Sequence, residues 1–314
     1  IDLGIPFSVE LKKEEDAPAD SLSVSFPYSG EIPQLPQLHM YKNGSLAFDG
    51  IVDEQAVSFG TKGRTLTLEC RSRAALLLDN EALPQQYQHP SLPLLFERHA
   101  LPYGLVRALG PQTVYSGTLS VTKGMSEWAV LFSFCNNYLG VRPRITPQGE
   151  LDATGMDSPL PPLFFSPTGG IPFLSLEERY LPCHLLSEVR VRAQSGGEYS
   201  IRLTDAQAVA QGIRRRRYCN AAPSSSRPAS FGEAMLRSAR EQSYRLTVVC
   251  PGWVDAEIGQ PCRVENPFLS VSEELLVCAV RYQRDMSSHT TSIILRKKAP
   301  RSGAFQKNFR FPKS

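Results

Sequence analysis

The sequence lacks any long hydrophobic run. No stretch of the 314 residues approaches the about 18 consecutive apolar residues that cross a bilayer, and residues 1–4 have no basic segment before an apolar one. We therefore expect neither a membrane-spanning helix nor a signal peptide. An excess of one charge sign is also missing. With 34 basic and 31 acidic side chains the net charge is +3, whereas a dedicated DNA-binding domain is usually more basic.

The motifs of common catalytic and cofactor sites are absent too. No Gly-x-Ser-x-Gly elbow, Walker loop or Gly-x-Gly-x-x-Gly follows a strand, and the strand-helix alternation that these motifs need is missing. The five histidines are dispersed, and no Cys-x-x-Cys or His-Glu-x-x-His occurs. Cys183 and His184 are adjacent, so on a strand they point to opposite faces and do not form a zinc site. We expect a non-enzymatic protein that needs no metal or organic cofactor.

Cysteine is present, but not in the pattern of a disulfide-rich protein. The number of cysteines is odd, their spacing is wide, and the chain is long enough to form its own cores. We interpret these side chains as reduced core thiols that pack rather than react. They are Cys70, Cys135, Cys183, Cys219, Cys250, Cys262 and Cys278.

Proline and glycine are abundant, at 25 and 22 residues. They divide the chain into short segments and leave little room for long helices, which favours turn-rich β structure. Residues 21–26 and 65–70 alternate polar and apolar side chains with a period of two, as strands with one buried face do. Between them, Asn43-Gly44 separates two apolar runs and tolerates the positive φ of a tight hairpin turn.

Helical periodicity is clear at two places. Ser126 can cap a helix that Gly140 ends, and Glu127 complements its dipole. We interpret its apolar face as core rather than as a ligand box. That face contains Trp128, Leu131, Phe132, Cys135 and Leu139. A second helix is expected at residues 231–242, after a Ser/Pro linker at residues 223–228.

These patterns predict a mainly β protein with an α+β insert. We expect two antiparallel β-barrel-like hub domains plus a small mixed insertion domain. Residues 1–83 form the first β-barrel unit, which residues 185–203 complete. Residues 84–184 form the α+β insertion domain, with a small hairpin at residues 144–151. Residues 204–243 are a linker and helix, and residues 244–314 form the second β-barrel unit with a C-terminal tail.

Asp53 and Glu54 could be mistaken for a catalytic carboxylate pair. Neighbours on a strand face opposite ways, so these two cannot share a substrate without a β-bulge. We expect one of them to lie in solvent and the other at a subunit or loop contact.

The most distinctive charged feature is a run of four arginines followed by Tyr218. Four guanidiniums and an aromatic ring suit contact with phosphates and stacking on a base. Arginines that alternate along a strand divide between its two faces, however, and the chain is nearly neutral. The run is therefore a candidate for ion pairing across a subunit interface or for a solvated face, as well as for phosphate contact. Its members are Arg214, Arg215, Arg216 and Arg217.

Several segments resemble one protein family in the same order along the chain. Residues 46–54 resemble a strand that ends in Gly-x-hydrophobic-Asp. Residues 64–79 resemble a Gly-Arg-Ser/Thr corner, with Cys70 in place of the glycine. Residues 124–151 resemble a helix and the small hairpin after it. Residues 206–218 are similar to the family's segment between two barrels, and residues 244–285 to its closing barrel. The family is that of the Mu-like phage tail baseplate hub, the late control D / tail protein P family.

The resemblance implies a structural role without catalysis. In such hubs two related β-barrel domains per subunit, repeated in a homotrimer, give six similar units that match the six-fold tail tube. The implied partners are the tail tube or tube-initiator protein, the central membrane-piercing spike protein and other baseplate proteins. DNA passes through the lumen without specific binding. The implied location is the baseplate of a contractile virion or prophage tail, made and assembled in the bacterial host cytoplasm.

Two other functions remain open from the residues alone. One is a β-rich cell-wall-active enzyme, and the other is a nucleic-acid-binding module. A hub should form trimers or bind tube and spike proteins, whereas a monomer whose melting temperature depends on substrate would favour the enzyme.

Overall fold

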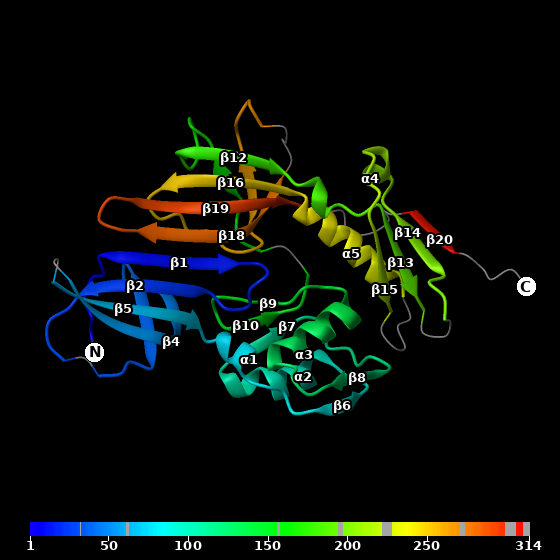
Figure 1. The fold of residues 1–314 in the computed structure, drawn as a ribbon, viewed down its shortest axis with the longest axis horizontal. Coiled ribbons are helices and arrows are strands. Elements are labelled where there is room, and N and C mark those ends of the chain that lie inside the picture. The colour runs from blue at the N-terminus through cyan, green and yellow to red at the C-terminus, as the bar shows by residue number, and fades with distance from the viewer. Residues whose placement is uncertain are drawn as a thin grey trace, which may run out of the picture.

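The computed structural model (Figure 1) describes the chain except for residues 32, 61–62, 156–157, 194–196, 222–227, 270–273, 299–305 and 310–314. The molecule is elongated and has three parts. A long antiparallel sheet makes up its largest part, a mixed unit of short helices and strands lies against that sheet, and a small sheet covered by one helix lies at the C-terminal end.

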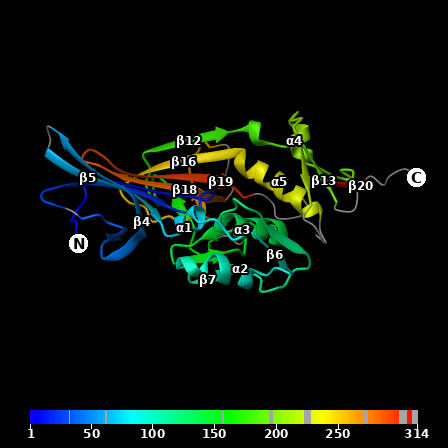
Figure 2. The same cartoon turned by 60° about the horizontal axis from the view of Figure 1, so that its bottom comes forward.

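Nine of the described strands form one continuous path in which every neighbouring pair is antiparallel (Figures 1 and 2). The order is β12 (Ser175–Tyr180), β16 (Tyr244–Pro251), β19 (His289–Lys297), β18 (Leu275–Arg284), β1 (Ser8–Glu14), β2 (Ser21–Pro27), β5 (Gly63–Ser72), β4 (Ser45–Gly60) and β3 (Gln37–Lys42). Off this path, β17 (Pro261–Val264) pairs with β18 and with β11 (Leu163–Phe165).

The alternating sequence explains the strands of this sheet. In β2, Leu22, Val24 and Phe26 are buried while the serines between them are half-buried. In the β3–β4 hairpin, Asn43 and Gly44 have φ values of 50° and 82°, the left-handed conformation that the Asn-Gly pair predicted. An N-terminal strand and a strand from the C-terminal part of the chain meet in the middle of the sheet, where β1 pairs with β18.

The insertion unit has its own hydrophobic core, which is formed by helices and short strands. Ser126 caps α3 by accepting a hydrogen bond from the amide of Ala129 at 3.2 Å. The elements are α1 (Ala75–Asp79), β6 (Gln85–Gln88), α2 (Leu92–His99), η1 (Leu101–Tyr103), β7 (Arg107–Leu109), β8 (Thr118–Val121), α3 (Glu127–Phe134), the π-helical η2 (Cys135–Leu139), β9 (Arg144–Ile145) and β10 (Glu150–Asp152). The core residues include Leu92, Leu95, Val130, Leu131 and Phe134.

A polar network lies within this core. His99 and Glu127 are both buried, and the Nδ1 of His99 contacts a carboxylate oxygen of Glu127. The hydroxyl of Tyr103 donates to the other oxygen at 3.0 Å, and the hydroxyl of Tyr87 lies 2.8 Å from Nε2 of His99. Burial raises the pKa of Tyr103, and the adjacent Glu127 raises it further. Glu127 thus does more than face the helix dipole, because it links α3 to α2 and η1.

The small sheet carries α5 on one face. Its strand order is β15 (Arg216–Asn220), β13 (Glu188–Arg192), β14 (Ile201–Thr204) and β20 (Gln306–Phe309). Around it lie α4 (Ala206–Ala210), α5 (Ala229–Gln242) and η3 (Pro182–His184). Leu236 of α5 packs with Val189 and Leu203. A Cβ at Gly232 would lie 2.3 Å from Cδ1 of Leu203, so the missing side chain allows the helix to approach the sheet closely.

The predicted fold class is confirmed: the chain is mainly β, with a large antiparallel sheet and a mixed insert. Helices occur at the two expected places, and the hairpin of β9 and β10 occurs at residues 144–152. The two expected β units are not separate closed barrels. They form one sheet because β1 pairs with β18. Among the described strands, β12 and β3 end the nine-strand path, and β11 ends the branch that leaves it at β18.

Three expectations differ from the structure. Residues 185–203 do not pair with the first β unit, because β13 and β14 pair with β15 and bury their valines and leucine under α5. In α3, Phe132 is exposed, and Val130 and Phe134 take its place in the core. Cys183 is not a core thiol, because it is exposed on η3. The Ser/Pro linker lies outside the described residues except for Pro228.

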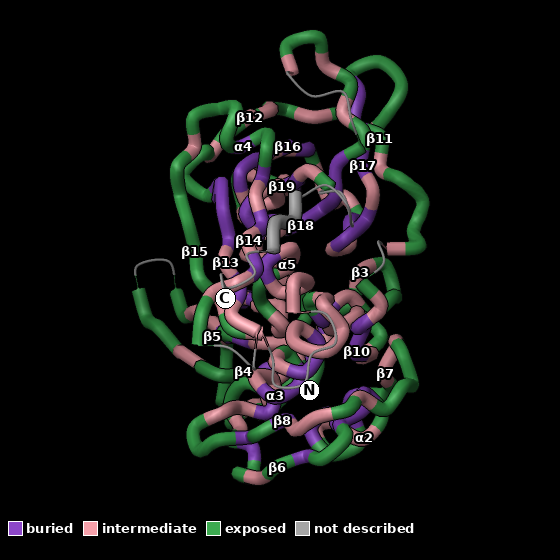
Figure 3. Tube along the Cα trace, turned by 90° about the vertical axis from the view of Figure 1, so that its right-hand side faces the viewer, coloured by how far each residue is buried: buried purple, intermediate pink, exposed green. Residues whose placement is uncertain are grey.

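Figure 3 shows how burial is distributed. Buried segments follow the inner sides of the strands and helices, whereas β15 runs along one flank as an exposed segment. Within the described part of the chain, none of the helices has the length and apolar character needed to cross a membrane.

Candidate interaction surface

The arginine run lies on and just before β15, an exposed strand whose described strand neighbour is β13. The two strands are parallel, with Arg216 opposite Glu188 and Arg217 opposite Val189. Arg214 and Arg215 immediately precede the strand, and all four arginines are exposed. The run therefore divides between two faces of the small sheet, as the alternation of a strand requires.

On the face away from α5, three arginines surround one glutamate. Glu188 has 6% of its side chain exposed, and the Nε atoms of Arg190, Arg202 and Arg216 lie 2.7, 2.6 and 2.5 Å from its carboxylate oxygens. These four residues are called the Glu188 cluster here. The arginine side chains are 28%, 43% and 47% exposed. One negative and three positive charges leave the cluster with an excess of positive charge that faces solvent.

The Glu188 cluster stabilises the ionised glutamate. Burial by itself would raise the pKa of Glu188, but the hydrogen bond from Arg190 and the charges of Arg202, Arg190 and Arg216 outweigh burial, so the pKa is below its usual value. The carboxylate in turn holds the three guanidiniums in fixed positions. Each of the three arginines approaches Glu188 through Nε, and Arg216 also forms a hydrogen bond with Tyr218.

Aromatic side chains border the same face. The rings of Tyr199 and Tyr218 meet edge to face with centroids 4.9 Å apart, and the guanidinium of Arg192 lies 5.4 Å from the centroid of Tyr199. Nε of Arg192 also donates to the side-chain oxygen of Asn220 at 3.1 Å. Tyr218 is 52% exposed. The face thus combines fixed guanidiniums with an accessible ring.

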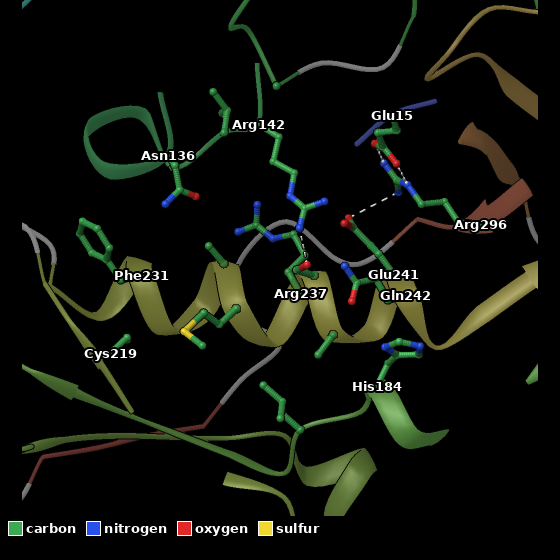
Figure 4. Close-up of a pocket in the computed structure, with 18 of the residues that line it drawn as sticks. Glu15, Asn136, Arg142, His184, Cys219, Phe231, Arg237, Glu241, Gln242 and Arg296 are labelled. Carbon is green, nitrogen blue, oxygen red and sulfur yellow. Dashed lines mark hydrogen bonds and ion pairs between the residues drawn. The ribbon is translucent and has the colours of Figure 1, made fainter. Parts of the chain in front are cut away.

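The other face of β15 borders a cleft of about 660 Å³. Arg215, Arg217 and Cys219 line one side of it, α5 crosses it, and the loop after η2 lines the far side. Figure 4 shows Arg142 from that loop extending toward Arg237 on α5. Arg215 donates to the carbonyl of Pro182 at 2.8 Å, and Arg217 donates to the carbonyl of its own neighbour, Arg216, at 3.2 Å.

Most arginines on the far side of this cleft have carboxylate partners. Nη1 of Arg142 lies 2.8 Å from Asp16, and its Nη2 donates to Ser238 at 2.7 Å. Arg296 lies 2.5 Å from Glu15 and 3.5 Å from Glu241 (Figure 4). Arg144 pairs with Asp152 at 2.7 Å in the same way. Among the described residues, Arg215 and Arg217 on the β15 side have carbonyl partners in place of carboxylates, so their positive charges are not neutralised in that part of the chain.

The other residues singled out from the sequence lie elsewhere. A β-bulge between Val52 and Glu54 accompanies Asp53, whose carboxylate accepts hydrogen bonds from Arg71 at 2.6 and 2.9 Å. Arg71 also binds Asp79, so Asp53 belongs to a surface ion-pair network. Cys183 and His184 lie on η3, beside the cleft. In the part of the chain that the structure describes, no three acidic, histidine or cysteine side chains group as a metal site would.

Sequence reasoning found the arginine run but missed Glu188, Arg190 and Arg202. A signal was present, since residues 188–192 alternate charged and valine side chains, which places Glu188 and Arg190 together on one face. The alternation does not predict that β13 pairs in parallel with β15, because β14 and α4 lie between these two strands in the sequence.

Comparison with solved structures shows the fold, whereas no protein-family model and no curated protein sequence matches the chain. The tail protein from Neisseria meningitidis is 19% identical, with a TM-score of 0.77, and the match covers 93% of this chain and 92% of that one. The 43 kDa tail protein of prophage MuSo2 from Shewanella oneidensis is 16% identical, with a TM-score of 0.75 and coverage of 93% and 94%.

A third similar structure comes from a secretion system. It is an Escherichia coli component of the type VI secretion system that exhibits structural similarity to the T4 bacteriophage tail proteins gp27 and gp5. It is 9% identical, with a TM-score of 0.64, and the match covers 95% of this chain and 76% of that one. The chain therefore has a fold that phage tail proteins and a related secretion component share.

Proposed function

We propose that this chain is the hub subunit of a contractile phage-type tail baseplate, which forms a trimeric ring between the tail tube and the membrane-piercing spike. The observation that carries the proposal is the nine-strand antiparallel path of the long sheet, whose two end strands, β12 and β3, differ in sequence. The fold shared with phage tail proteins supports the same role.

The two edges suit head-to-tail assembly. An exposed sheet edge presents unpaired backbone groups, and pairing with a neighbouring subunit satisfies them. A contact between two different surfaces of identical subunits closes into a ring when the rotation permits it. The edge strand β12 carries Glu177 and Glu178, whereas the edge strand β3 carries His39 and Lys42. Within one subunit Glu177 pairs with Arg179, and His39 and Lys42 pair with Asp49 and Asp255. β12 of one subunit beside β3 of the next would therefore bring opposite charges together by exchange of these pairs.

The sheet also divides at the β1–β18 pair into two groups of antiparallel strands. Strands β1 to β5 form one half and β16, β18, β19 and β12 the other, and both lie in the same continuous surface. Three subunits would contribute six halves, which suits a six-fold tube on one side of the ring and a three-fold spike on the other. In this role the chain is structural and not catalytic. It works in the virion baseplate beside other baseplate proteins, and DNA passes through the lumen without specific binding.

Light scattering of the purified chain tests the ring. We expect three times the 34.8 kDa mass of one chain. Glu177→Lys should raise the dissociation constant of the trimer several-fold, because a lysine there would face the basic side chains of β3. Glu97→Lys on α2 is the matched control, since Glu97 is exposed and lies outside both edges. A chain that stays monomeric at all concentrations would rule out the hub role.

A further inference from the structure

Among the described strands, β15 pairs on one side only, and the backbone pattern of its other edge is definite. The amides of Ser187 and Glu188 donate to the carbonyl of Arg215, and the amide of Ala221 donates to the carbonyl of Arg192 on β13. Backbone groups alternate in direction along a strand, so the odd-numbered residues of β15 bond to β13. The backbone groups of Arg216, Tyr218 and Asn220 therefore point away from the sheet, where an added strand could bind them.

Guanidiniums lie on both sides of that edge. Arg216 belongs to the Glu188 cluster on one face, while Arg217 and Arg215 lie beside the cleft on the other. The side chains of a strand laid along β15 would alternate between these two faces. Carboxylates at successive positions of such a strand would thus meet arginine on each face, in the charge-assisted geometry that guanidinium and carboxylate favour.

We propose that β15 docks an extended acidic peptide segment of another tail protein by strand addition, with its carboxylates held by Arg216 on one face and by Arg215 and Arg217 on the other. The origin of the segment in another tail protein rests on the function proposed above, whereas the binding chemistry does not. Strand addition combines backbone hydrogen bonds with side-chain contacts at alternate positions.

The cleft provides room for one side of the added strand. It has a volume of about 660 Å³, with β15 and α5 on one side and the loop after η2 on the other, and the half-buried Phe231 and Met235 of α5 line it together with Arg217. Side chains that enter from the added strand would meet both apolar surface and positive charge there. On the other face, the exposed ring of Tyr218 lies beside Arg216 and would cover part of the segment.

An acidic peptide fits better than a nucleic acid. A phosphate backbone does not use the free amides of a strand edge, and its affinity depends on many unpaired basic groups in a row. Here Glu188 interrupts the basic face, and Glu15, Glu241 and Asp152 lie among the arginines of the cleft. A second copy of the chain is less suitable as the occupant, because the proposed ring uses β12 and β3 for contacts between copies.

A selection from displayed random peptides of about ten residues, the length of one strand, tests the proposal on the full chain. We expect enriched peptides with acidic residues at successive positions, since neighbouring side chains of the added strand face the two arginine-bearing faces. Fluorescence anisotropy should show that Arg216→Glu/Arg217→Glu weakens their binding about tenfold or more, as the loss of charge-assisted hydrogen bonds implies. The matched control is Arg98→Glu/Arg107→Glu, which reverses two exposed arginines of the insertion unit and should leave binding unchanged.

Hydrogen exchange supplies an independent measurement. In the presence of a selected peptide, the amides of Arg216, Tyr218 and Asn220 should gain protection, while those of Arg217 and Cys219 should already be protected in the free chain. The absence of enriched acidic peptides, equal binding by the Arg216/Arg217 variant, or unchanged exchange at Tyr218 would overturn the proposal. Tight binding of a single-stranded oligonucleotide in place of acidic peptides would replace it with phosphate contact.

The solution mass separates this proposal from the hub function. The Arg216→Glu/Arg217→Glu variant should retain the same mass as the unmodified chain, because β15 is not an edge of the ring. If the chain binds acidic peptides but forms no trimer, only the proposed hub function is contradicted. A trimer that binds no acidic peptide would contradict strand addition alone.

Discussion

Two glutamates in this molecule each gather several polar partners, but in opposite settings. Glu127 lies inside the insertion unit, where His99 and Tyr103 satisfy its two oxygens within a closed hydrophobic core. Glu188 lies at the base of an open surface, where three arginines share its two oxygens and extend into solvent.

The buried Glu127 network can only stabilise the fold, whereas the exposed Glu188 cluster can also bind a partner. The Glu127 network lies away from the surface. Its hydrogen bonds stabilise the packing of α3 against α2 and η1. The Glu188 cluster leaves an excess of positive charge on guanidiniums whose positions are fixed. Preorganised groups of this kind lose little conformational entropy on binding, which favours the recognition of an anionic partner.

The largest effect should come from the closed network. Glu127→Gln removes the charge opposite His99 in a buried site, and we expect it to lower the free energy of unfolding of the insertion unit by about 3 kcal/mol. The chain has two tryptophans, Trp128 in the insertion unit and Trp253 outside it. Denaturation followed by the fluorescence of Trp128 in a Trp253→Phe background therefore reports this unit.

The control for this variant is Glu97→Gln on α2, because Glu97 is an exposed glutamate in the same unit. It should change the transition by less than about 0.5 kcal/mol. Equal transitions for Glu127→Gln and Glu97→Gln would mean that the buried network contributes nothing specific to stability.

The open cluster should give a smaller effect that depends on pH. Glu188→Gln leaves three arginines without their carboxylate, and we expect a loss of about 2 kcal/mol at pH 7 in denaturation followed by circular dichroism. Because the pKa of Glu188 is lowered in the folded protein, its contribution is present above the ordinary carboxylate pKa of 4.5 and disappears as the pH falls through the lowered value. The difference between the two proteins should therefore vanish in acid.

Glu97→Gln also serves as the control for the cluster. Glu97 is exposed on α2, away from the proposed ring contacts, so its loss should cost little. Salt should reduce the stability loss of Glu188→Gln more than that of Glu127→Gln, because it screens exposed charges more than buried ones. A deficit of Glu188→Gln that persists unchanged in both acid and high salt would show that the cluster acts through packing and not through charge.

The fold was predictable from the sequence where the signal was local. The caps at Ser126 and Gly140, the Asn43-Gly44 turn and the alternation in β2 depend on neighbours a few residues away. The pairing of β1 with β18 was not predictable, because it joins Val9 to Arg284 and either strand could equally have closed its own barrel. The site was half predictable for the same reason. The arginine run is visible in the sequence, but the parallel register that brings Glu188 to it is a tertiary property.

Asp20 is a third carboxyl group to compare with Glu127 and Glu188, because its charged neighbours are not arginines. Asp20 precedes β2, and its backbone amide donates to the hydroxyl of Ser72 at 3.0 Å. Its nearest charges are Lys13 and Glu257, which pair with each other at 2.9 Å and so largely cancel. Burial therefore dominates and raises the pKa of Asp20 to about 6, with the charge of Lys13 opposing it and that of Glu257 adding to it.

The smallest expected effect follows from this raised pKa, and its sign is opposite to that of Glu188. The folded protein holds the Asp20 proton more tightly than the unfolded chain does. The resulting stability is fully present below the ordinary pKa of 3.8 and is lost as the pH rises through about 6. Because Asp20 is only half-buried, solvent screening reduces the effect, and Asp20→Asn should stabilise the protein by about 1 kcal/mol at pH 7 and leave it nearly unchanged near pH 4. Denaturation at the two pH values, with the exposed Asp2→Asn as control, checks this. Stabilisation of the same size at both would attribute the effect to the amide group itself and not to removal of the carboxylate charge.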